Sequence, residues 1–308
     1  MQMKWRGVMP ATTTAFDDNL NIDHEFVAKH ATWLSDNGCT AIIAPGSLGE
    51  SATLSFDEKL ALWSTLVVAV GDRVPVVAAI ASLSTAEAEL LAKRAADVGC
   101  SGLMVLPPYV YRSEWREMKA HVDAVLRATN LSCMLYNNPV AYGTDFLPEQ
   151  IHELAQQHEN LAAVKESSTD VRRITWIKEL TADRLEISVG VDDAIVEGIA
   201  AGAVGWVAGL VNALPKESVE LFNYALKGEH EKARALYYWF LPLLRMDTVP
   251  KFVQLIKLVQ HEVGMGSTRV RPPRLELIGQ ELEDATRIIR QALETRIELS
   301  TSSAARNP

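Results

Sequence analysis

Cysteine is scarce in this sequence, with three residues among 308, at Cys39, Cys100 and Cys133. An odd number cannot pair completely, and the wide spacing fits neither a disulfide framework nor the close ligand pairs that bind zinc. We therefore expect each cysteine to be a small buried apolar group, and we predict no metal site.

Long apolar runs and an excess of positive charge are also lacking. No stretch reaches the roughly 18 apolar residues of a membrane helix, and the N-terminal residues do not resemble a secretory signal. Acidic residues outnumber basic ones by 39 to 30, which gives a formal charge of -9 and no basic patch for nucleic acid or anionic lipid. We expect a cytoplasmic protein whose partners are small molecules, with no nucleic acid and no membrane among them.

A glycine-rich nucleotide-binding turn is the third absence. Residues 12–16, at the end of the first predicted strand, contain no G-x-G-x-x-G pattern, which disfavours an open doubly wound sheet. The sequence instead alternates short β-branched runs with longer helical patterns. The runs predict strands over residues 8–13, 41–44, 74–80, 102–106, 131–136, 161–165, 185–189 and 205–208. About eight strands with intervening helices favour an α/β fold, a closed (β/α)8 TIM barrel with a C-terminal helical extension.

The last third of the chain loses the strand signal. Beyond Asn212, apolar residues recur at helical spacing over residues 217–226, 230–244, 249–263 and 277–293. The prediction is a barrel over 1–212, C-terminal helices packed on the barrel over 213–299, and a flexible tail over 300–308. The tail is small and polar, and we therefore expect it to fray.

Lys165 closes the sixth predicted strand, directly after the apolar residues 161–164. The carboxyl ends of barrel strands meet around one mouth, and active sites form there. A dry barrel interior favours the neutral amine form of an enclosed lysine, and this form attacks carbonyl carbons. From position alone, the alternative is a side chain that extends to solvent.

Two other strand ends carry polar groups. The second strand runs into residues 46–50 (GSLGE), whose backbone N–H groups are suited to bind a carboxylate. The alternative is an ordinary turn in which Ser47 caps the following helix. The fifth strand ends at Tyr136, and the turn-forming residues beyond it favour a phenol that projects over the mouth and transfers protons. The alternative for this tyrosine is ordinary packing.

Four motifs together resemble those of the dihydrodipicolinate synthase and N-acetylneuraminate lyase family of class I aldolases. They are GSLGES at 46–51, YNNP at 136–139, VKES at 164–167 and GVDD at 190–193. The resemblance runs from about Gly7 to at least the helix near Leu226. It implies a TIM barrel, a Schiff base at Lys165, Tyr136 as proton shuttle and general acid or base, and no metal or organic cofactor.

The resemblance also implies the remaining site residues. Ser47 relays protons, and a tyrosine from a neighbouring subunit completes the relay, with Tyr109 as the best match and Tyr111 as the alternative. The implied assembly is a homo-oligomer, either a dimer or a dimer of dimers. From position alone, Asp192 and Asp193 are expected to cap the helix after the seventh strand. The substrate-binding residues are Gly46, Ser47, Leu48, Asn138, Gly190 and Val207.

Two departures from the family pattern bear on the substrate. Lysine-biosynthetic synthases have an arginine where this chain has Ala141, and a second loop hydroxyl where it has Leu48. The loss of both polar contacts argues against synthase activity. The stretch from residues 211–215 through residues 239–242 resembles the branch that deaminates 1-pyrroline-4-hydroxy-2-carboxylate to 2-oxoglutarate semialdehyde in hydroxyproline catabolism, and we predict this activity. The alternatives are a 2-oxo-3-deoxy sugar acid aldolase or dehydratase and, disfavoured by Ala141, 4-hydroxy-tetrahydrodipicolinate synthase.

Overall fold

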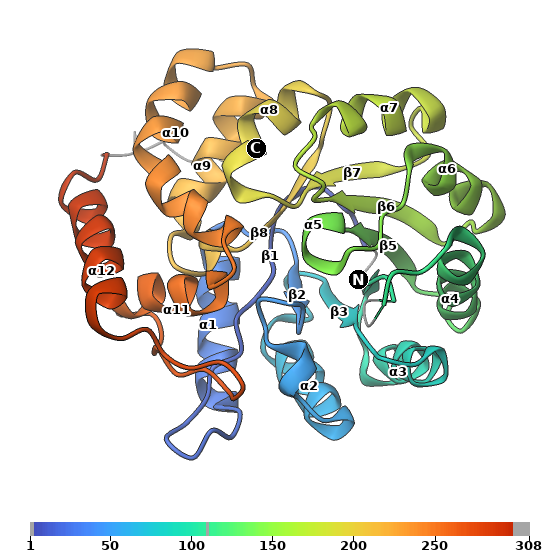
Figure 1. The fold of residues 1–308 in the computed structure, drawn as a ribbon, viewed down its shortest axis with the longest axis horizontal. Coiled ribbons are helices and arrows are strands. Elements are labelled where there is room, and N and C mark those ends of the chain that lie inside the picture. The colour runs from blue at the N-terminus through green and yellow to red at the C-terminus, as the bar shows by residue number, and fades with distance from the viewer. Residues whose placement is uncertain (1–2, 109–110, 298–308) are drawn as a thin grey trace, which may run out of the picture.

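The computed structural model describes residues 3–108 and 111–297 as a ring of parallel strands surrounded by helices (Figure 1). The eight strands pair in the order β1-β8-β7-β6-β5-β4-β3-β2. Hydrogen bonds from Thr40 N to Val8 O and from Thr12 N to Ile43 O, each 2.9 Å long, join the first and second strands and close the ring. The predicted (β/α)8 barrel is therefore confirmed.

The elements alternate along the chain as the sequence predicts. The strands are β1 (Gly7–Pro10), β2 (Ile42–Ala44), β3 (Val76–Ile80), β4 (Gly102–Val105), β5 (Ser132–Asn137), β6 (Leu161–Glu166), β7 (Glu186–Val189) and β8 (Gly205–Ala208). The helices between them are α1 (His24–Asp36), α2 (Phe56–Val70), α3 (Thr85–Val98), α4 (Trp115–Arg127), α5 (Pro139–Tyr142), α6 (Pro148–Gln157), α7 (Arg172–Thr181) and α8 (Ile195–Ala200). The C-terminal helices are α9 (Pro215–Leu226), α10 (His230–Leu244), α11 (Phe252–Glu262) and α12 (Gly279–Glu294).

Short 3₁₀ segments complete the connections: η1 (Ser51–Thr53), η2 (Asp192–Ala194), η3 (Leu210–Asn212) and η4 (Arg245–Thr248). The boundary that we predicted at residue 212 falls at the end of η3, and the predicted tail over 300–308 lies outside the described residues. The helix predicted over 249–263 begins only at Phe252. Val249 is extended, with φ −116° and ψ 161°, because the ring of Pro250 disfavours a helical conformation in the preceding residue.

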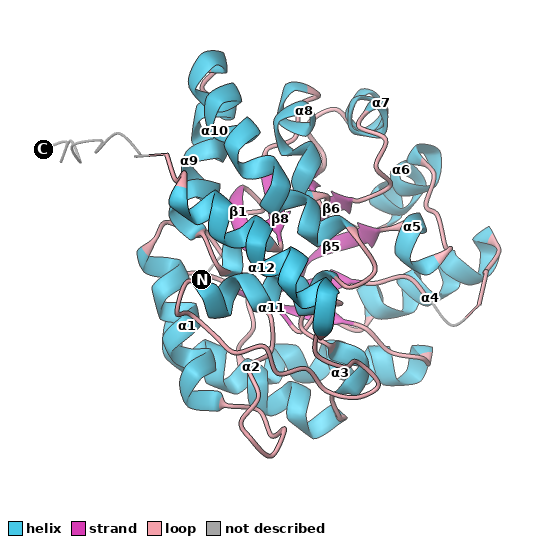
Figure 2. Ribbon diagram, turned by 60° about the vertical axis from the view of Figure 1, so that its left-hand side comes forward, coloured by secondary structure: helices cyan, strands magenta, loops and turns pink. Residues whose placement is uncertain are grey.

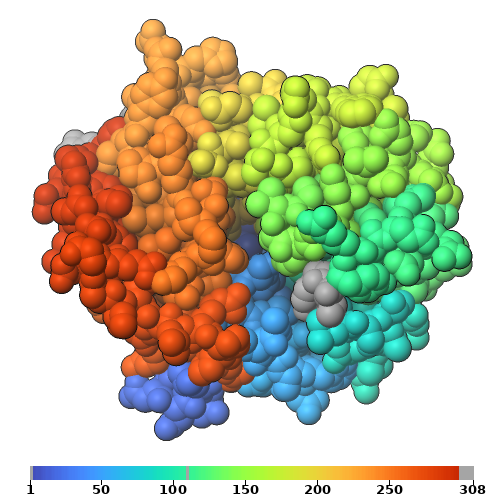
Figure 3. Space-filling model, in the orientation of Figure 1, coloured from blue at the N-terminus to red at the C-terminus, as the bar shows by residue number. Residues whose placement is uncertain are grey.

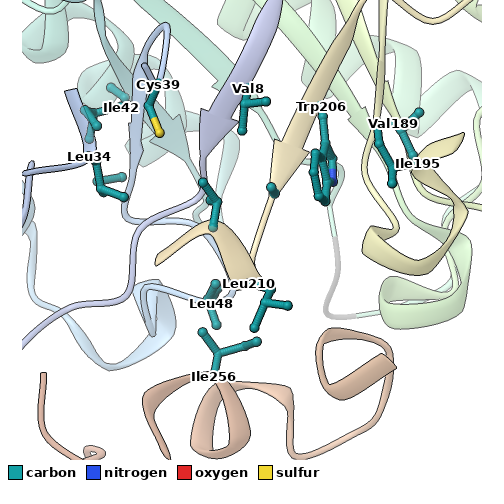
Figure 4. Packing of buried hydrophobic residues seen from close by; sticks show 14 of the residues in the cluster. Val8, Leu34, Cys39, Ile42, Leu48, Val189, Ile195, Trp206, Leu210 and Ile256 are labelled. Atoms are coloured by element: carbon teal, nitrogen blue, oxygen red, sulfur yellow. The ribbon is translucent and has the colours of Figure 1, made fainter. Parts of the chain in front are cut away.

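Side chains alternate along each strand between two apolar layers, as the pleat requires. In β3, Val76 belongs to the layer between strands and helices, whereas Val77 fills the barrel interior. Figure 4 shows the outer layer near β1 and β8, where Val8, Trp206 and Leu34 are among the buried side chains. The barrel interior is thus a packed core, and a cavity lies at the carboxyl end of the strands.

The C-terminal helices lie on one side of the barrel (Figures 1 and 2). α9 packs against α8, α10 packs against α9 and α12, and α11 packs against η4 and α12. Ile256 of α11 lies beside Leu48 and Leu210 near the carboxyl end of β8 (Figure 4). A buried ion pair of 2.6 Å between Lys257 Nζ and Glu50 Oε1 joins α11 to the loop after β2. These helices therefore contribute to the wall of the barrel mouth.

The three cysteines are buried and unpaired, as predicted. Burial raises the pKa of each thiol to about 12, so the thiols are protonated and unreactive at neutral pH. Within residues 3–108 and 111–297, no helix is long and apolar enough to cross a membrane. The same residues contain no group of three or more His, Cys, Asp or Glu side chains placed to hold a metal ion.

Candidate active site

A cavity of about 510 Å³ lies at the carboxyl end of the barrel. Figure 3 shows the hollow near the centre of the molecule, between the orange C-terminal helices and the green segment around α5. Apart from the alternative Tyr111, every predicted site residue that the structure describes lies in the cavity wall. These residues are Gly46, Ser47, Leu48, Tyr136, Asn138, Lys165, Gly190 and Val207.

Lys165 lies beside Tyr136 because the two residues are register partners in the parallel pair of β5 and β6. The lysine is 6% exposed, and its Nζ lies 4.1 Å from the centroid of the Tyr136 ring, which is 5% exposed. Both residues line the cavity. The amine is therefore enclosed, and the alternative in which it extends to bulk solvent is wrong.

Gly190, at the end of β7, makes room for the lysine. A Cβ atom at this position would lie 2.5 Å from Lys165 Cε and 2.0 Å from Ser167 Oγ, too close for any other residue to fit without displacing them. Ser167 also lines the cavity, and its buried hydroxyl has no hydrogen-bond partner among the described residues. No role was predicted for Ser167 from the sequence, although this residue follows the lysine by two positions and continues the same face of the strand.

A buried polar network lies behind these two strand ends. Asn137 Nδ2 donates to Glu166 Oε2 at 3.1 Å and to Asp145 Oδ1 at 3.2 Å. Asp145 also pairs with Arg173 at 2.5 Å. Burial raises the pKa of Glu166, and the hydrogen bonds that its carboxylate accepts oppose the rise. The network joins β5 to β6. It therefore fixes the spacing between Tyr136 and Lys165, which directly precede Asn137 and Glu166 on these strands.

Hydroxyl groups line one side of the cavity. Asn138 Nδ2 donates to Tyr136 Oη at 2.9 Å, while Asn138 Oδ1 accepts from the Ala141 N–H at 3.0 Å and caps α5. Ser47 Oγ is hydrogen-bonded to Tyr142 Oη. The Tyr142 ring stands edge-on to the Tyr136 ring, with 5.8 Å between the centroids. Tyr142 thus connects the loop after β2 to the tyrosine at the end of β5.

The loop after β2 presents backbone donors to the cavity. Ser47 and Leu48 line the cavity, and neither N–H has an acceptor among the described residues. Glu50 adopts a left-handed conformation, with φ 56° and ψ 33°, which turns the chain sharply into η1. The helix α2 that follows is capped by Ser55, so the alternative in which Ser47 caps it is wrong.

Asp192 and Asp193 form no helix cap, contrary to the expectation from sequence. Asp192 is fully buried and joins the ends of β7 and β8, because it accepts hydrogen bonds from Trp206 Nε1 at 2.9 Å, Gly209 N–H at 3.1 Å and Leu210 N–H at 2.7 Å. Burial raises the pKa of Asp192 to about 6, while these donors oppose the rise. Its partners lie further along the chain, on and just after the next strand. Capping rules consider only neighbouring residues and therefore could not predict these contacts.

Part of the cavity wall comes from a region that the sequence did not mark as functional: Asp247, Thr248, Val249, Pro250, Phe252 and Arg274. They lie in η4, in the connection to α11, at the first residue of α11 and in the segment after it, and they form no recognisable motif. Tyr109 lies outside the described residues. Tyr111, its alternative, is 54% exposed and does not line the cavity. The tyrosine from a neighbouring subunit, and with it the homo-oligomer, stays a prediction.

Known proteins are similar to this chain in sequence and in fold. Residues 4–292 match the Dihydrodipicolinate synthetase family. A 4-hydroxy-tetrahydrodipicolinate synthase of Methanocaldococcus jannaschii is 31% identical over 274 residues, which cover 89% of this chain and 93% of the relative. The enzyme of the same name from Natronomonas pharaonis is 38% identical over 240 residues, which cover 78% of this chain and 81% of the relative. A crystal structure of a dihydrodipicolinate synthase from Bacillus anthracis has a TM-score of 0.90 at 31% identity, covering 94% of this chain and 99% of that chain.

The match extends over nearly all of the chain and includes the strand ends that form the cavity. Sequence and structure agree on the same relatives. The chain therefore belongs to the dihydrodipicolinate synthetase family, a family of class I Schiff-base lyases.

Proposed function

We propose that Lys165 forms a Schiff base with the carbonyl or imine carbon of a small 2-oxo-acid-type substrate. The enclosed amine is the observation that supports this most, because Lys165 is buried, lines the cavity and lies 4.1 Å from the Tyr136 ring. An amine held out of bulk water in this way can attack the electrophilic carbon of a substrate bound in the cavity. The N–H groups of Ser47 and Leu48 offer two donors for the substrate carboxylate.

The later steps follow from the chemistry of an iminium ion. The iminium withdraws electrons from the adjacent carbon and acidifies its proton. Tyr136, whose Oη accepts a hydrogen bond from Asn138, is placed to remove and return that proton. The Ser47 hydroxyl is held by its hydrogen bond to Tyr142, whose ring stands edge-on to that of Tyr136, and we propose that it relays protons on this side of the cavity. The resulting enamine then releases a leaving group or breaks a bond at the next carbon.

Within this class we propose that the substrate is 1-pyrroline-4-hydroxy-2-carboxylate. Ala141 gives the cavity wall no guanidinium where a synthase is expected to bind its aldehyde substrate, and Leu48 replaces a loop hydroxyl. Lys165 adds to the ring imine carbon, and the ring nitrogen departs as a primary amine. The substrate then loses its C4 hydroxyl as water, and hydrolysis releases ammonia and 2-oxoglutarate semialdehyde.

A second candidate is 4-hydroxy-tetrahydrodipicolinate synthase activity. The names of the relatives favour it, because both sequence relatives described above are synthases of this kind. Arg274 also lines the cavity and provides a guanidinium from a different part of the chain than position 141. A sugar-acid aldolase or dehydratase would use the same Schiff base and would differ only in its contacts with the rest of the substrate.

A panel of substrates separates these candidates. The protein is assayed with 1-pyrroline-4-hydroxy-2-carboxylate, a 2-oxo-3-deoxy sugar acid, N-acetylneuraminate, and pyruvate together with aspartate semialdehyde. We expect turnover of the first, with stoichiometric release of ammonia. Failure on the first together with condensation of pyruvate and aspartate semialdehyde would identify a synthase and reject the deaminase.

Replacing Tyr136 by phenylalanine is expected to lower turnover by about 100-fold, because the ring that packs near Lys165 remains while the proton-transferring hydroxyl is lost. The adduct with Lys165 should still form and be trapped by borohydride. Tyr237→Phe is the matched control, since Tyr237 is also 5% exposed and its hydroxyl contacts Asp193 O and Glu197 away from the cavity. Undiminished turnover of the Tyr136 variant would remove this residue from the mechanism.

A further inference from the structure

Asp247 is a carboxyl group in the cavity wall that the mechanism above does not use. It lies in η4, which packs against η2 at the end of β7. Tyr136 lies on β5, and β5 and β7 are the two neighbours of β6, which carries Lys165. The tyrosine and the carboxyl group therefore approach the lysine from different sides of the cavity.

Gly209 allows the Asp247 carboxyl group to lie against the end of β8. A Cβ atom at Gly209 would be 2.0 Å from Asp247 Oδ1, and Gly209 itself lines the cavity. Any side chain at this position would displace the carboxyl group. The strand end is thus shaped to hold Asp247 at the cavity wall, although more than 30 residues separate the two in the sequence.

Hydrogen bonds distinguish Asp247 from its neighbour Asp192. Asp192 is surrounded by the three N–H donors described above, which stabilise its carboxylate form. With a pKa of about 6, Asp192 is ionised at neutral pH. No described residue donates a hydrogen bond to Asp247, so nothing in the described part of the chain stabilises a second negative charge there.

The neighbouring carboxylates also favour the protonated form of Asp247. Asp247 is half-buried in the cavity wall, where desolvation raises its pKa well above its usual range, and the negative charge of Asp192 adds to this rise. Lys165 opposes the rise, and Asp193, which faces Arg245 at 3.9 Å, supports it. Of the two adjacent carboxyl groups, the one that lines the cavity is therefore the one whose protonated form is favoured.

We propose that Asp247 is a catalytic general acid that protonates the leaving hydroxyl group of the substrate, an inference that rests on the proposed function. In the enamine on Lys165, the electron pair of the C2–C3 double bond moves to C3–C4 and the C4–O bond breaks. The hydroxyl leaves as water with the proton of Asp247. The Asp247 carboxylate next removes a proton from C5, which forms a dienamine and restores the acid without any oxidant or reductant.

The test separates the two halves of the reaction. Asp247→Asn keeps the shape of the side chain but cannot supply a proton. We expect its release of ammonia from the hydroxypyrroline substrate to fall by about 100-fold or more. Exchange of the methyl protons of pyruvate in D2O needs only the Schiff base and Tyr136, and we expect it to stay within about 3-fold of the wild type. Borohydride trapping of pyruvate should also be retained.

Two further variants make the result decisive. Asp247→Glu retains an acid and should lose less turnover than the Asn variant. Asp123→Asn removes a half-buried carboxylate that pairs with His158 and neither lines the cavity nor acts on Asp247, and it should leave both reactions unchanged. Normal turnover in Asp247→Asn would overturn the inference, as would a parallel loss of turnover and exchange in both Asp247 variants, which would indicate a structural role.

The proposed function fails in a different and visible way. A wild-type protein that forms no adduct with pyruvate has no Schiff base, whatever the Asp247 variants do. If the wild-type protein forms the adduct but only condenses pyruvate with aspartate semialdehyde, its reaction expels no hydroxyl group from C4. That outcome rejects both the deaminase activity and the acid role of Asp247. Deamination by the wild type with an unaffected Asp247→Asn variant rejects the acid role alone.

Discussion

Replacing Lys165 by methionine is expected to lower turnover by about 1000-fold or more and to abolish the adduct that borohydride traps with pyruvate. Methionine is nearly as long as lysine and apolar, so it fills the narrow space beside Gly190 without a charge. The fold should therefore persist while the nucleophile is lost. Mass spectrometry of the intact protein and of its peptides after reduction reports both the presence of the adduct and its position.

Lys59 provides a matched control for this experiment. It is also 6% exposed, and its Nζ donates to Ala81 O at 3.1 Å, but it does not line the cavity. Burial lowers the pKa of Lys59, which makes the control stringent, because an enclosed amine without access to the cavity should form no adduct. Lys59→Met should keep the adduct and the turnover. An adduct that persists in Lys165→Met, on any other lysine, would reject the role given to Lys165.

Replacing Lys257 by methionine is expected to lower the free energy of unfolding by about 3–5 kcal/mol. The Glu50 carboxylate is fully buried, and the variant leaves it without the ammonium that lies 2.6 Å away. The Arg269 carbonyl loses a hydrogen bond from the same ammonium, also of 2.6 Å. Unfolding by guanidinium chloride, with the slope compared between variants, measures the change.

The double variant Glu50→Gln with Lys257→Met tests the cause of this loss. Removing both charges avoids an uncompensated buried carboxylate, so the double variant should recover part of the stability that the single variant loses. The amide oxygen that replaces the carboxylate would still accept from the Arg271 N–H, which donates to Glu50 at 2.9 Å in the native protein. A single variant that loses less than about 1 kcal/mol would mean that the pair contributes little.

Much of this fold is predictable because its signals are local. Strands buried on both faces appear as short continuous apolar runs, and all eight runs correspond to strands. The meeting of Tyr136 and Lys165 was predictable for the same reason, since both close neighbouring strands of one barrel. The turn at Glu50 could not be placed from sequence, because glutamate has no preference for the left-handed conformation that it adopts there.

The rest of the site depends on contacts between distant segments. Asp247 follows α10 in a connection that contains no motif, and only packing against Gly209 brings it to the cavity. Asp192 appeared to be a helix cap because aspartate before a helix usually is one. Its real partners lie 14 to 18 residues further along the chain, at Trp206, Gly209 and Leu210.

The anchoring of Glu50 has a consequence for biosynthesis. Its partners Lys257 and Arg271 follow it by 207 and 221 residues, so a ribosome releases all eight strands before either partner emerges. The nascent barrel must keep the Glu50 carboxylate hydrated until α11 has been made and docks. Maturation of the loop that faces Lys165 is in this way coupled to late translation. In arrested nascent chains, the Glu50 carboxylate would become buried only after α11 leaves the exit tunnel.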